Sequence, residues 1–94
     1  MQHIEQYKTL ILPVLKRHLI KRAAIFGSFA KGNASSTSDV DMLIEGDRSF
    51  TMFRMLELEE EISNILDRKV DLVEYSAIKS SIRSEVLETA ITIL

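Results

Sequence analysis

Cysteine is absent from this 94-residue sequence, and proline and glycine are scarce, with one and three copies. Without cysteine the chain can form neither a disulfide framework nor a thiolate metal site, which suits a reducing compartment. Few proline and glycine residues beside a hydrophobic content of 46% favour a packed globule over a disordered chain. The length fits one small domain with one core, which we expect to span residues 1–94.

Long apolar runs and a strong charge of one sign are also missing. No stretch reaches the roughly 18 uninterrupted apolar residues of a membrane span, and the N-terminus carries Glu5 and no visible secretory signal. The formal net charge is −2, from 12 basic and 14 acidic residues, which argues against binding long nucleic acids by phosphate neutralisation. These absences predict a cytoplasmic protein that binds neither a membrane nor extended nucleic acid.

The spacing of apolar residues predicts alternating helices and strands. Helices are expected over residues 4–19, 28–31, 51–66 and 79–89, and strands over 23–26, 40–44 and 70–74. Pro13 is expected to kink or restart the first helix. Residues 90–94 alternate like a strand that adds to a sheet edge or docks elsewhere. This order predicts an α/β (α+β) fold in which helices cover a small mixed sheet.

The helix expected over residues 51–66 is amphipathic. Phe53 falls on its outer, acidic face with Glu57, Glu60 and Asn64. The apolar residues that recur at intervals of three and four, and that we expect to face the core, are Met52, Met55, Leu56, Ile62, Ile65 and Leu66.

A glycine-containing turn follows the first expected strand. Gly27 lets the backbone approach a phosphate closely, Ser28 supplies a hydroxyl, and the start of the next short helix supplies N–H groups. Lys31, one turn into that helix, would neutralise phosphate charge, and Gly32 would let the chain leave sharply. The turn therefore suits a polyphosphate.

Three aspartates lie on or beside the two strands that follow. Asp39 and Asp41 are two residues apart, so in a strand their carboxylates point to the same side, and Asp71 lies in the next strand. Carboxylates this close repel each other unless a divalent cation sits between them, and Mg²⁺ prefers such oxygen ligands. Together the three acids suit a two-metal site for in-line displacement at phosphorus. Taken singly, each is also explained as a cap, a solvent-facing strand residue or a loop-end acid.

The combination of Gly27-Ser28, Asp39-x-Asp41 and Asp71 in a later strand resembles the DNA polymerase β-type nucleotidyltransferase superfamily. At this length the chain is similar to the minimal nucleotidyltransferases, which include the MntA-type antitoxins encoded beside HEPN-domain toxins. The resemblance covers residues 1–94 and implies a mixed sheet flanked by helices. It is expected to leave no part of the chain for a separate substrate domain.

The resemblance also implies roles for the site residues. Asp39 and Asp41 would hold two Mg²⁺ ions, and Asp71 would ligate the catalytic ion and help to activate the attacking hydroxyl. Gly27 and Ser28 would contact the phosphates of ATP, the nucleotide donor. Lys31 would assist them, although a solvated helix lysine explains this residue equally well.

Three functions follow as alternatives. An enzyme would transfer AMP from ATP to a tyrosine of a cognate HEPN toxin, and the toxin would supply the acceptor surface that larger relatives build from an added helical domain. A non-catalytic antitoxin would instead block the toxin sterically. A small-molecule nucleotidyltransferase would build its acceptor pocket by self-association. A small core also favours a homo- or hetero-oligomer, because a partner buries further surface.

Overall fold

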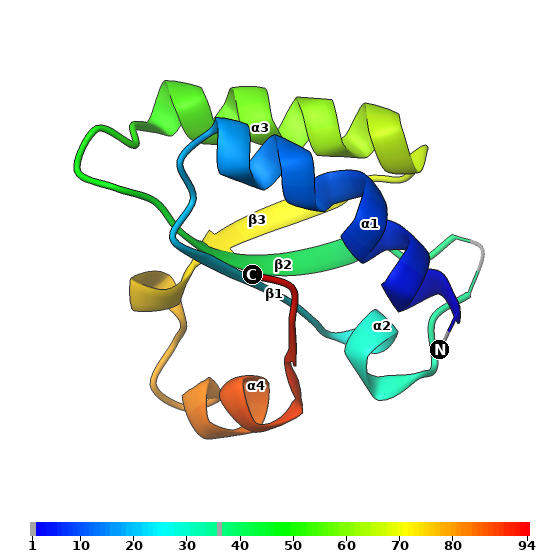
Figure 1. Ribbon diagram of the computed structural model, residues 1–94. Coiled ribbons are helices and arrows are strands. Elements are labelled where there is room, and N and C mark those ends of the chain that lie inside the picture. Colours follow the sequence, from blue (N-terminus) through cyan, green and yellow to red (C-terminus); the bar gives the residue numbers. More distant parts are fainter. Residues whose placement is uncertain (1, 36) are drawn as a thin grey trace.

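The computed structural model describes residues 2–35 and 37–94, and its strands form one mixed sheet in the order β3-β2-β1-β4 (Figure 1). Strand β1 (Arg22–Phe26) runs antiparallel to β2 (Val40–Glu45) and to β4 (Ile91–Thr92), and β2 runs parallel to β3 (Val70–Glu74). The predicted α+β fold with a mixed sheet is confirmed. The C-terminal segment forms an edge strand, which is one of the two outcomes that its alternation allowed.

The helices lie on two sides of the sheet. They are α1 (Gln2–Arg17), α2 (Ser28–Lys31), α3 (Met52–Leu66) and α4 (Arg83–Thr89), with a 3₁₀ helix η1 (Tyr75–Ala77) after β3. Helices α1 and α3 cover one face, while η1 and α4 lie on the opposite side (Figure 1). No helix in the described part of the chain is long and apolar enough to cross a membrane.

Two helix boundaries differ from the sequence prediction. Helix α1 runs through Pro13 without a break, which excludes the restart, one of the two outcomes that the proline allowed. It ends at Arg17 because Leu19 takes a left-handed φ of 60°, while the N–H groups of Leu19 and Ile20 donate to the last carbonyls of the helix. Helix α4 begins at Arg83, later than the expected residue 79, because residues 75–77 form η1 first. The loop expected over residues 32–38 includes Ser36, which lies outside the described residues.

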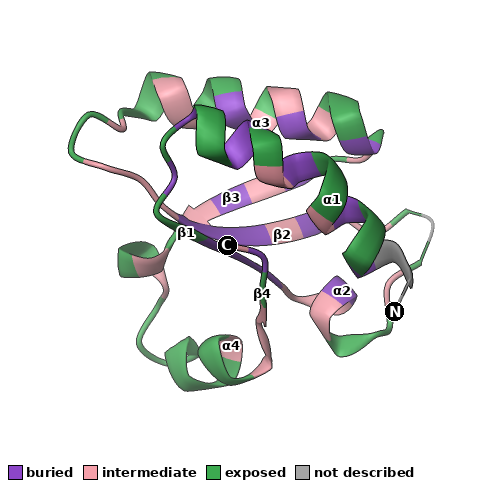
Figure 2. Ribbon diagram, in the orientation of Figure 1, coloured by how far each residue is buried: buried purple, intermediate pink, exposed green. Residues whose placement is uncertain are grey.

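The core lies between the sheet and helices α1 and α3, where Figure 2 shows the buried residues. Alternation along each strand decides which side chains enter it. The strand residues on this covered face are Ala23, Ile25, Val40, Met42, Ile44, Val70 and Leu72. Because successive residues point to opposite faces, Asp41 and Asp71 lie on the other face, beneath which η1 and α4 are placed.

Helix α3 buries part of the expected apolar set, together with Leu58, which was not in that set. Leu58, Ile62 and Leu66 are buried at intervals of four, with Met55 partly buried beside them. The expected core residues Met52, Leu56 and Ile65 are 67%, 54% and 37% exposed. The helix carries apolar residues on more than one side, but the sheet and α1 cover only the side that holds Leu58, Ile62 and Leu66. Phe53 is 85% exposed, as predicted.

Which side of α3 is buried can be tested with two matched substitutions. Leu58→Ala is expected to lower the free energy of unfolding by about 2–5 kcal/mol, because it leaves a cavity at a fully buried position. Leu56→Ala, two residues away on the exposed side, should change it by no more than about 0.5 kcal/mol. Urea unfolding curves measure both values. Equal losses would place Leu56 in the core and contradict the packing described for α3.

The outer edge of β3 is occupied by side chains of α3. The Val70 N–H donates to Ser63 Oγ at 3.1 Å, and the Leu72 N–H donates to Glu59 Oε2 at 3.0 Å. These two bonds take up backbone donors that would otherwise be free to pair with another chain. They also fix the position of Asp71, which lies between the two bonded residues.

Candidate active site

The turn after β1 requires glycine for two independent reasons. Gly27 has φ 72° and ψ −148°, a region that residues with a Cβ avoid. A Cβ at this position would also lie 2.5 Å from Oδ2 of Asp41, whose backbone is paired with Phe26 across β1 and β2. The glycine turn and the first strand-borne acid are therefore in contact, as a phosphate-binding turn beside a carboxylate site requires.

Asp41 and Asp71 are direct neighbours on the parallel strands β2 and β3, and Asp39 precedes β2 by one residue. Burial raises the pKa of Asp41, and the nearby charges of Asp71 and Asp39 raise it further. The structure thus brings the three predicted acids close enough for the charges of Asp39 and Asp71 to act on Asp41. Across the described ranges, however, no three acidic or histidine side chains are gathered into a preassembled metal cage.

The donor chemistry of this cluster fits Mg²⁺. Its ligands would be carboxylate oxygens, and a cation would relieve the repulsion that Asp41 experiences. In the structure Asp39 is paired with Lys69, with 3.9 Å between Oδ2 of Asp39 and Nζ of Lys69. Lys69 was not singled out in the sequence. Because this pair is well exposed, it is weak and would yield readily to a divalent ion.

Lys31 is paired with an acid that the sequence did not point to. Its Nζ lies 3.0 Å from Oε1 of Glu85 on α4, 54 residues further along the chain. Gly32 ends α2 at a left-handed φ of 78°, which confirms the expected sharp exit. Ser28 is the first residue of α2, directly after the glycine turn.

Two cavities lie beneath α4, one of them at the glycine turn, and none of the three aspartates lines either. One, of about 210 Å³, is lined by Phe26, Gly27, Lys31, Ile82, Glu85, Val86 and Thr89. The other, of about 270 Å³, is lined by Phe26, Val73, Ala77, Ile78, Lys79, Ile82 and Val86. Because they share Phe26, Ile82 and Val86, they adjoin each other along the open face of the sheet.

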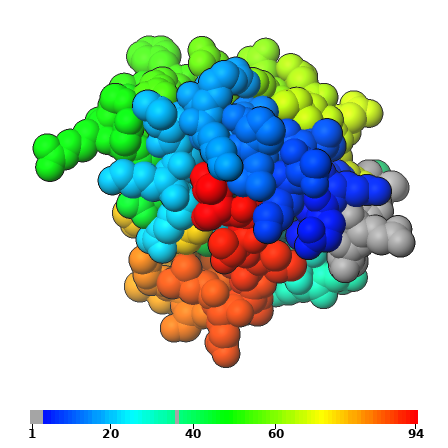
Figure 3. Space-filling view, viewed as in Figure 1, coloured from blue at the N-terminus to red at the C-terminus, as the bar shows by residue number. Residues whose placement is uncertain are grey.

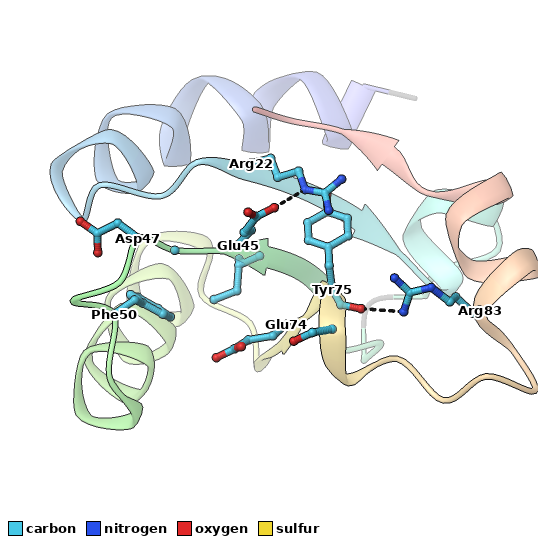
Figure 4. Close-up of a pocket in the computed structure, with 10 residues that line it drawn as sticks. Arg22, Glu45, Asp47, Phe50, Glu74, Tyr75 and Arg83 are labelled. Carbon is cyan, nitrogen blue, oxygen red and sulfur yellow. Dashed lines mark hydrogen bonds and ion pairs between the residues drawn. The ribbon is translucent and has the colours of Figure 1, made fainter.

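A further cavity, of about 370 Å³, lies at the opposite end of this face and is not lined by any of the three aspartates (Figure 4). Arg22 donates to Glu45 at 2.6 Å, and its guanidinium lies 3.8 Å from the centre of the Tyr75 ring. Burial raises the pKa of the Tyr75 hydroxyl. Arg83 donates to the Tyr75 carbonyl at 3.0 Å. These contacts hold η1 and the start of α4 in place.

Comparison with known proteins agrees with the geometry. The family model for polymerase β nucleotidyltransferases matches residues 10–94. A Methanocaldococcus jannaschii protein, provisionally named a protein adenylyltransferase, is 33% identical over 98% of this chain and 99% of its own length. The protein adenylyltransferase MntA of Thermococcus cleftensis is 34% identical over 81% of this chain and 77% of its own length.

Solved structures show the same fold. One provisionally named minimal nucleotidyltransferase has a TM-score of 0.83 at 28% identity, over 96% of this chain and 92% of that one. A chain from a complex of tri-AMPylated Shewanella oneidensis HEPN toxin with MNT antitoxin has a TM-score of 0.73 at 17% identity, over 96% of this chain and 71% of that one. The second likeness shows the fold alone. Taken with the family match, these findings establish that the chain belongs to the polymerase β nucleotidyltransferase family and is a minimal nucleotidyltransferase of the MntA kind.

Proposed function

We propose that this protein is a Mg²⁺-dependent adenylyltransferase that moves AMP from ATP to a tyrosine of a HEPN-domain toxin, and so acts as the antitoxin of that toxin. The observation that carries the proposal is the contact of the Gly27 turn with Asp41, which in turn neighbours Asp71 across two parallel strands. The names of the MntA relative and of the AMPylated toxin complex support the nucleotide and the partner.

Each site residue has a role in this proposal. Gly27 and Ser28 would receive the β- and γ-phosphates through the backbone and the hydroxyl, and Lys31 would leave Glu85 to add positive charge. Asp39 and Asp41 would hold two Mg²⁺ ions, with Asp71 as a further ligand. When bound, the metal ions would neutralise the negative charge of the phosphates during transfer.

The transfer itself is a displacement at the α-phosphorus. The tyrosine oxygen forms a bond to that phosphorus, the bond to the β-phosphate bridging oxygen breaks, and pyrophosphate leaves. Asp71 would accept the tyrosine proton. Its position on β3, on the side of Asp41 away from the glycine turn, supports this role. Positioning the acceptor in line is then the task of the HEPN partner.

The proposal is tested by intact mass. The protein is incubated with ATP, Mg²⁺ and its proposed HEPN partner, and the mass of that partner should rise by one or more AMP units on a tyrosine. A chelator should abolish the increase, because the phosphate charge is then uncompensated. Asp71→Asn should also abolish it while the two proteins still co-purify, since the docking surface is intact.

One outcome would favour steric inhibition instead. A HEPN protein whose mass never changes, but which is inhibited equally by wild type and by Asp71→Asn, would show that binding alone silences it. In such a non-catalytic antitoxin two ion pairs would stay intact when the toxin binds. They are Lys31 with Glu85 and Lys69 with Asp39.

A further inference from the structure

The two cavities beneath α4 share three lining residues, and together we call them the α4 groove. The shared residues are Phe26 of β1, Ile82 just before α4, and Val86 of α4. One end reaches Gly27 and Lys31, and the other reaches Val73, two residues beyond Asp71 on the same side of β3. The space-filling view shows α4 as a lobe of the molecule beside the C-terminal segment (Figure 3).

The position of the groove relative to the reacting atoms indicates which part of the nucleotide or acceptor it binds. Gly27 follows β1, Asp41 lies on β2 and Asp71 on β3, so the line from leaving pyrophosphate to incoming hydroxyl runs across the strands. In an in-line displacement the attacking and leaving oxygens occupy the two apical positions. The oxygen that joins the nucleoside to the α-phosphorus is then equatorial, and the nucleoside departs at a large angle to that line.

The α4 groove extends away from the line that joins the leaving pyrophosphate to the incoming hydroxyl, as the nucleoside must. From Gly27, which neighbours Asp41, it extends to Val73 on β3 and to Ile78 beyond η1. Resting on the proposed function, we infer that the α4 groove binds the ribose and base of the donor nucleotide. The acceptor tyrosine would instead enter across the outer side of Asp71, where the groove does not reach.

The lining predicts how the base is recognised. At the Val73 end the side chains are apolar apart from Lys79, and Phe26 provides an aromatic surface. A base held by such surfaces gains affinity from burial but meets few side-chain donors or acceptors that distinguish one base from another. The groove therefore favours bases of similar size almost equally, so ATP and GTP should bind with affinities within about tenfold of each other.

Helix α4 is suited to be the roof of a ligand site because it contributes little to the core. None of its side chains is buried, and two polar contacts connect it to the rest of the molecule. Arg83 donates to the Tyr75 carbonyl, and Lys31 donates to Glu85. Changes on α4 can therefore alter ligand binding without disrupting the fold. Val86 and Leu87 offer a matched pair, since Val86 lines both cavities whereas Leu87 lines neither and is exposed.

The test compares ATP with tripolyphosphate, which carries the phosphates without a nucleoside. Calorimetry with Mg²⁺ should show that wild type binds ATP more tightly than tripolyphosphate. Val86→Gln should weaken ATP binding by about tenfold, the scale of one altered apolar contact in a pocket, and leave tripolyphosphate binding unchanged. Leu87→Gln should change neither, and circular dichroism should show both variants folded.

The outcomes separate this inference from the proposed function. If wild type binds neither ATP nor tripolyphosphate, both are overturned. If both ligands bind with equal affinity, or if Val86→Gln leaves ATP affinity unchanged, the nucleoside assignment is wrong while nucleotide binding stands. An unchanged ATP affinity with slower transfer to the HEPN partner would assign the groove to the acceptor. A GTP affinity more than about a hundredfold below that of ATP would contradict the predicted tolerance of bases.

Discussion

Replacing Asp41 with Asn is expected to reduce AMP transfer by at least about a hundredfold and, at the same time, to stabilise the metal-free protein at neutral pH. Activity falls because an amide ligand cannot supply the negative charge that the proposed Mg²⁺ site needs. Stability rises because Asp41 is partly buried against Asp71 and Asp39, whose charges oppose its ionisation. Opposite effects on the two properties distinguish a functional acid from a structural one.

The pH dependence of the stability gain follows from the sign of the pKa shift. The pKa of Asp41 in the folded protein is raised above its ordinary value of 3.8. Below that value the carboxyl is protonated in both the folded and the unfolded chain, so Asn and Asp behave alike. As the pH rises through the raised pKa, ionisation increasingly penalises the folded state. The gain from Asp41→Asn should therefore be near zero at about pH 3 and positive at pH 7.

Urea unfolding at both pH values, in the presence of a chelator, measures this difference. Asp47→Asn serves as a control of opposite sign, because hydrogen bonds from Ser49 lower the pKa of Asp47 and its ionised form stabilises the fold. That variant should lose stability at pH 7 and not at pH 3. An Asp41→Asn protein that unfolds more easily at neutral pH would show that this acid supports the fold.

The parts of the site that the sequence predicted correctly depend on local spacing. Strand alternation predicted that Asp39 and Asp41 point to the same side, with Asp71 in the next strand. The structure pairs Asp41 with Asp71 across β2 and β3 and places Asp39 one residue before β2. The change from an apolar run to Gly27 marked the end of β1. Both signals extend over only a few residues, and a two-residue period leaves little freedom in which face a side chain occupies. The roles of Asp39 and Ser28 as ligands stay predictions, as does the phosphate contact of Lys31.

The parts that the sequence missed depend on how distant elements meet. Glu85 is an unremarkable helix acid until the fold sets α4 against α2 and pairs it with Lys31. Likewise, periodicity predicted the burial of Ile62 and Leu66 on α3, but it included Leu56 and missed Leu58. The spacing of apolar residues does not fix the exact edge of the buried face, because tertiary packing decides how much of the helix is covered.

Gly27→Ala is expected to combine a loss of stability with a loss of activity. The left-handed φ of 72° strains any residue with a Cβ, and the added methyl would lie 2.5 Å from the Asp41 carboxylate. We expect the free energy of unfolding to fall by about 1–3 kcal/mol. Transfer should fall by about a hundredfold in the protein that remains folded, because a shift of about 1 Å in a catalytic group has effects of that size.

Two further variants separate strain from collision at this turn. Gly32→Ala introduces the same methyl at a left-handed φ of 78°, but no atom lies within 4 Å of it, so it should cost about 1 kcal/mol and spare transfer. In an Asp41→Ala background the carboxylate is gone, and Gly27→Ala should then cost only its backbone strain. The difference between its cost in wild type and in that background is the coupling energy of the contact. A coupling energy of zero would mean that the turn and the acid are independent, and the close approach of Gly27 to Asp41 would then have no part in shaping the site.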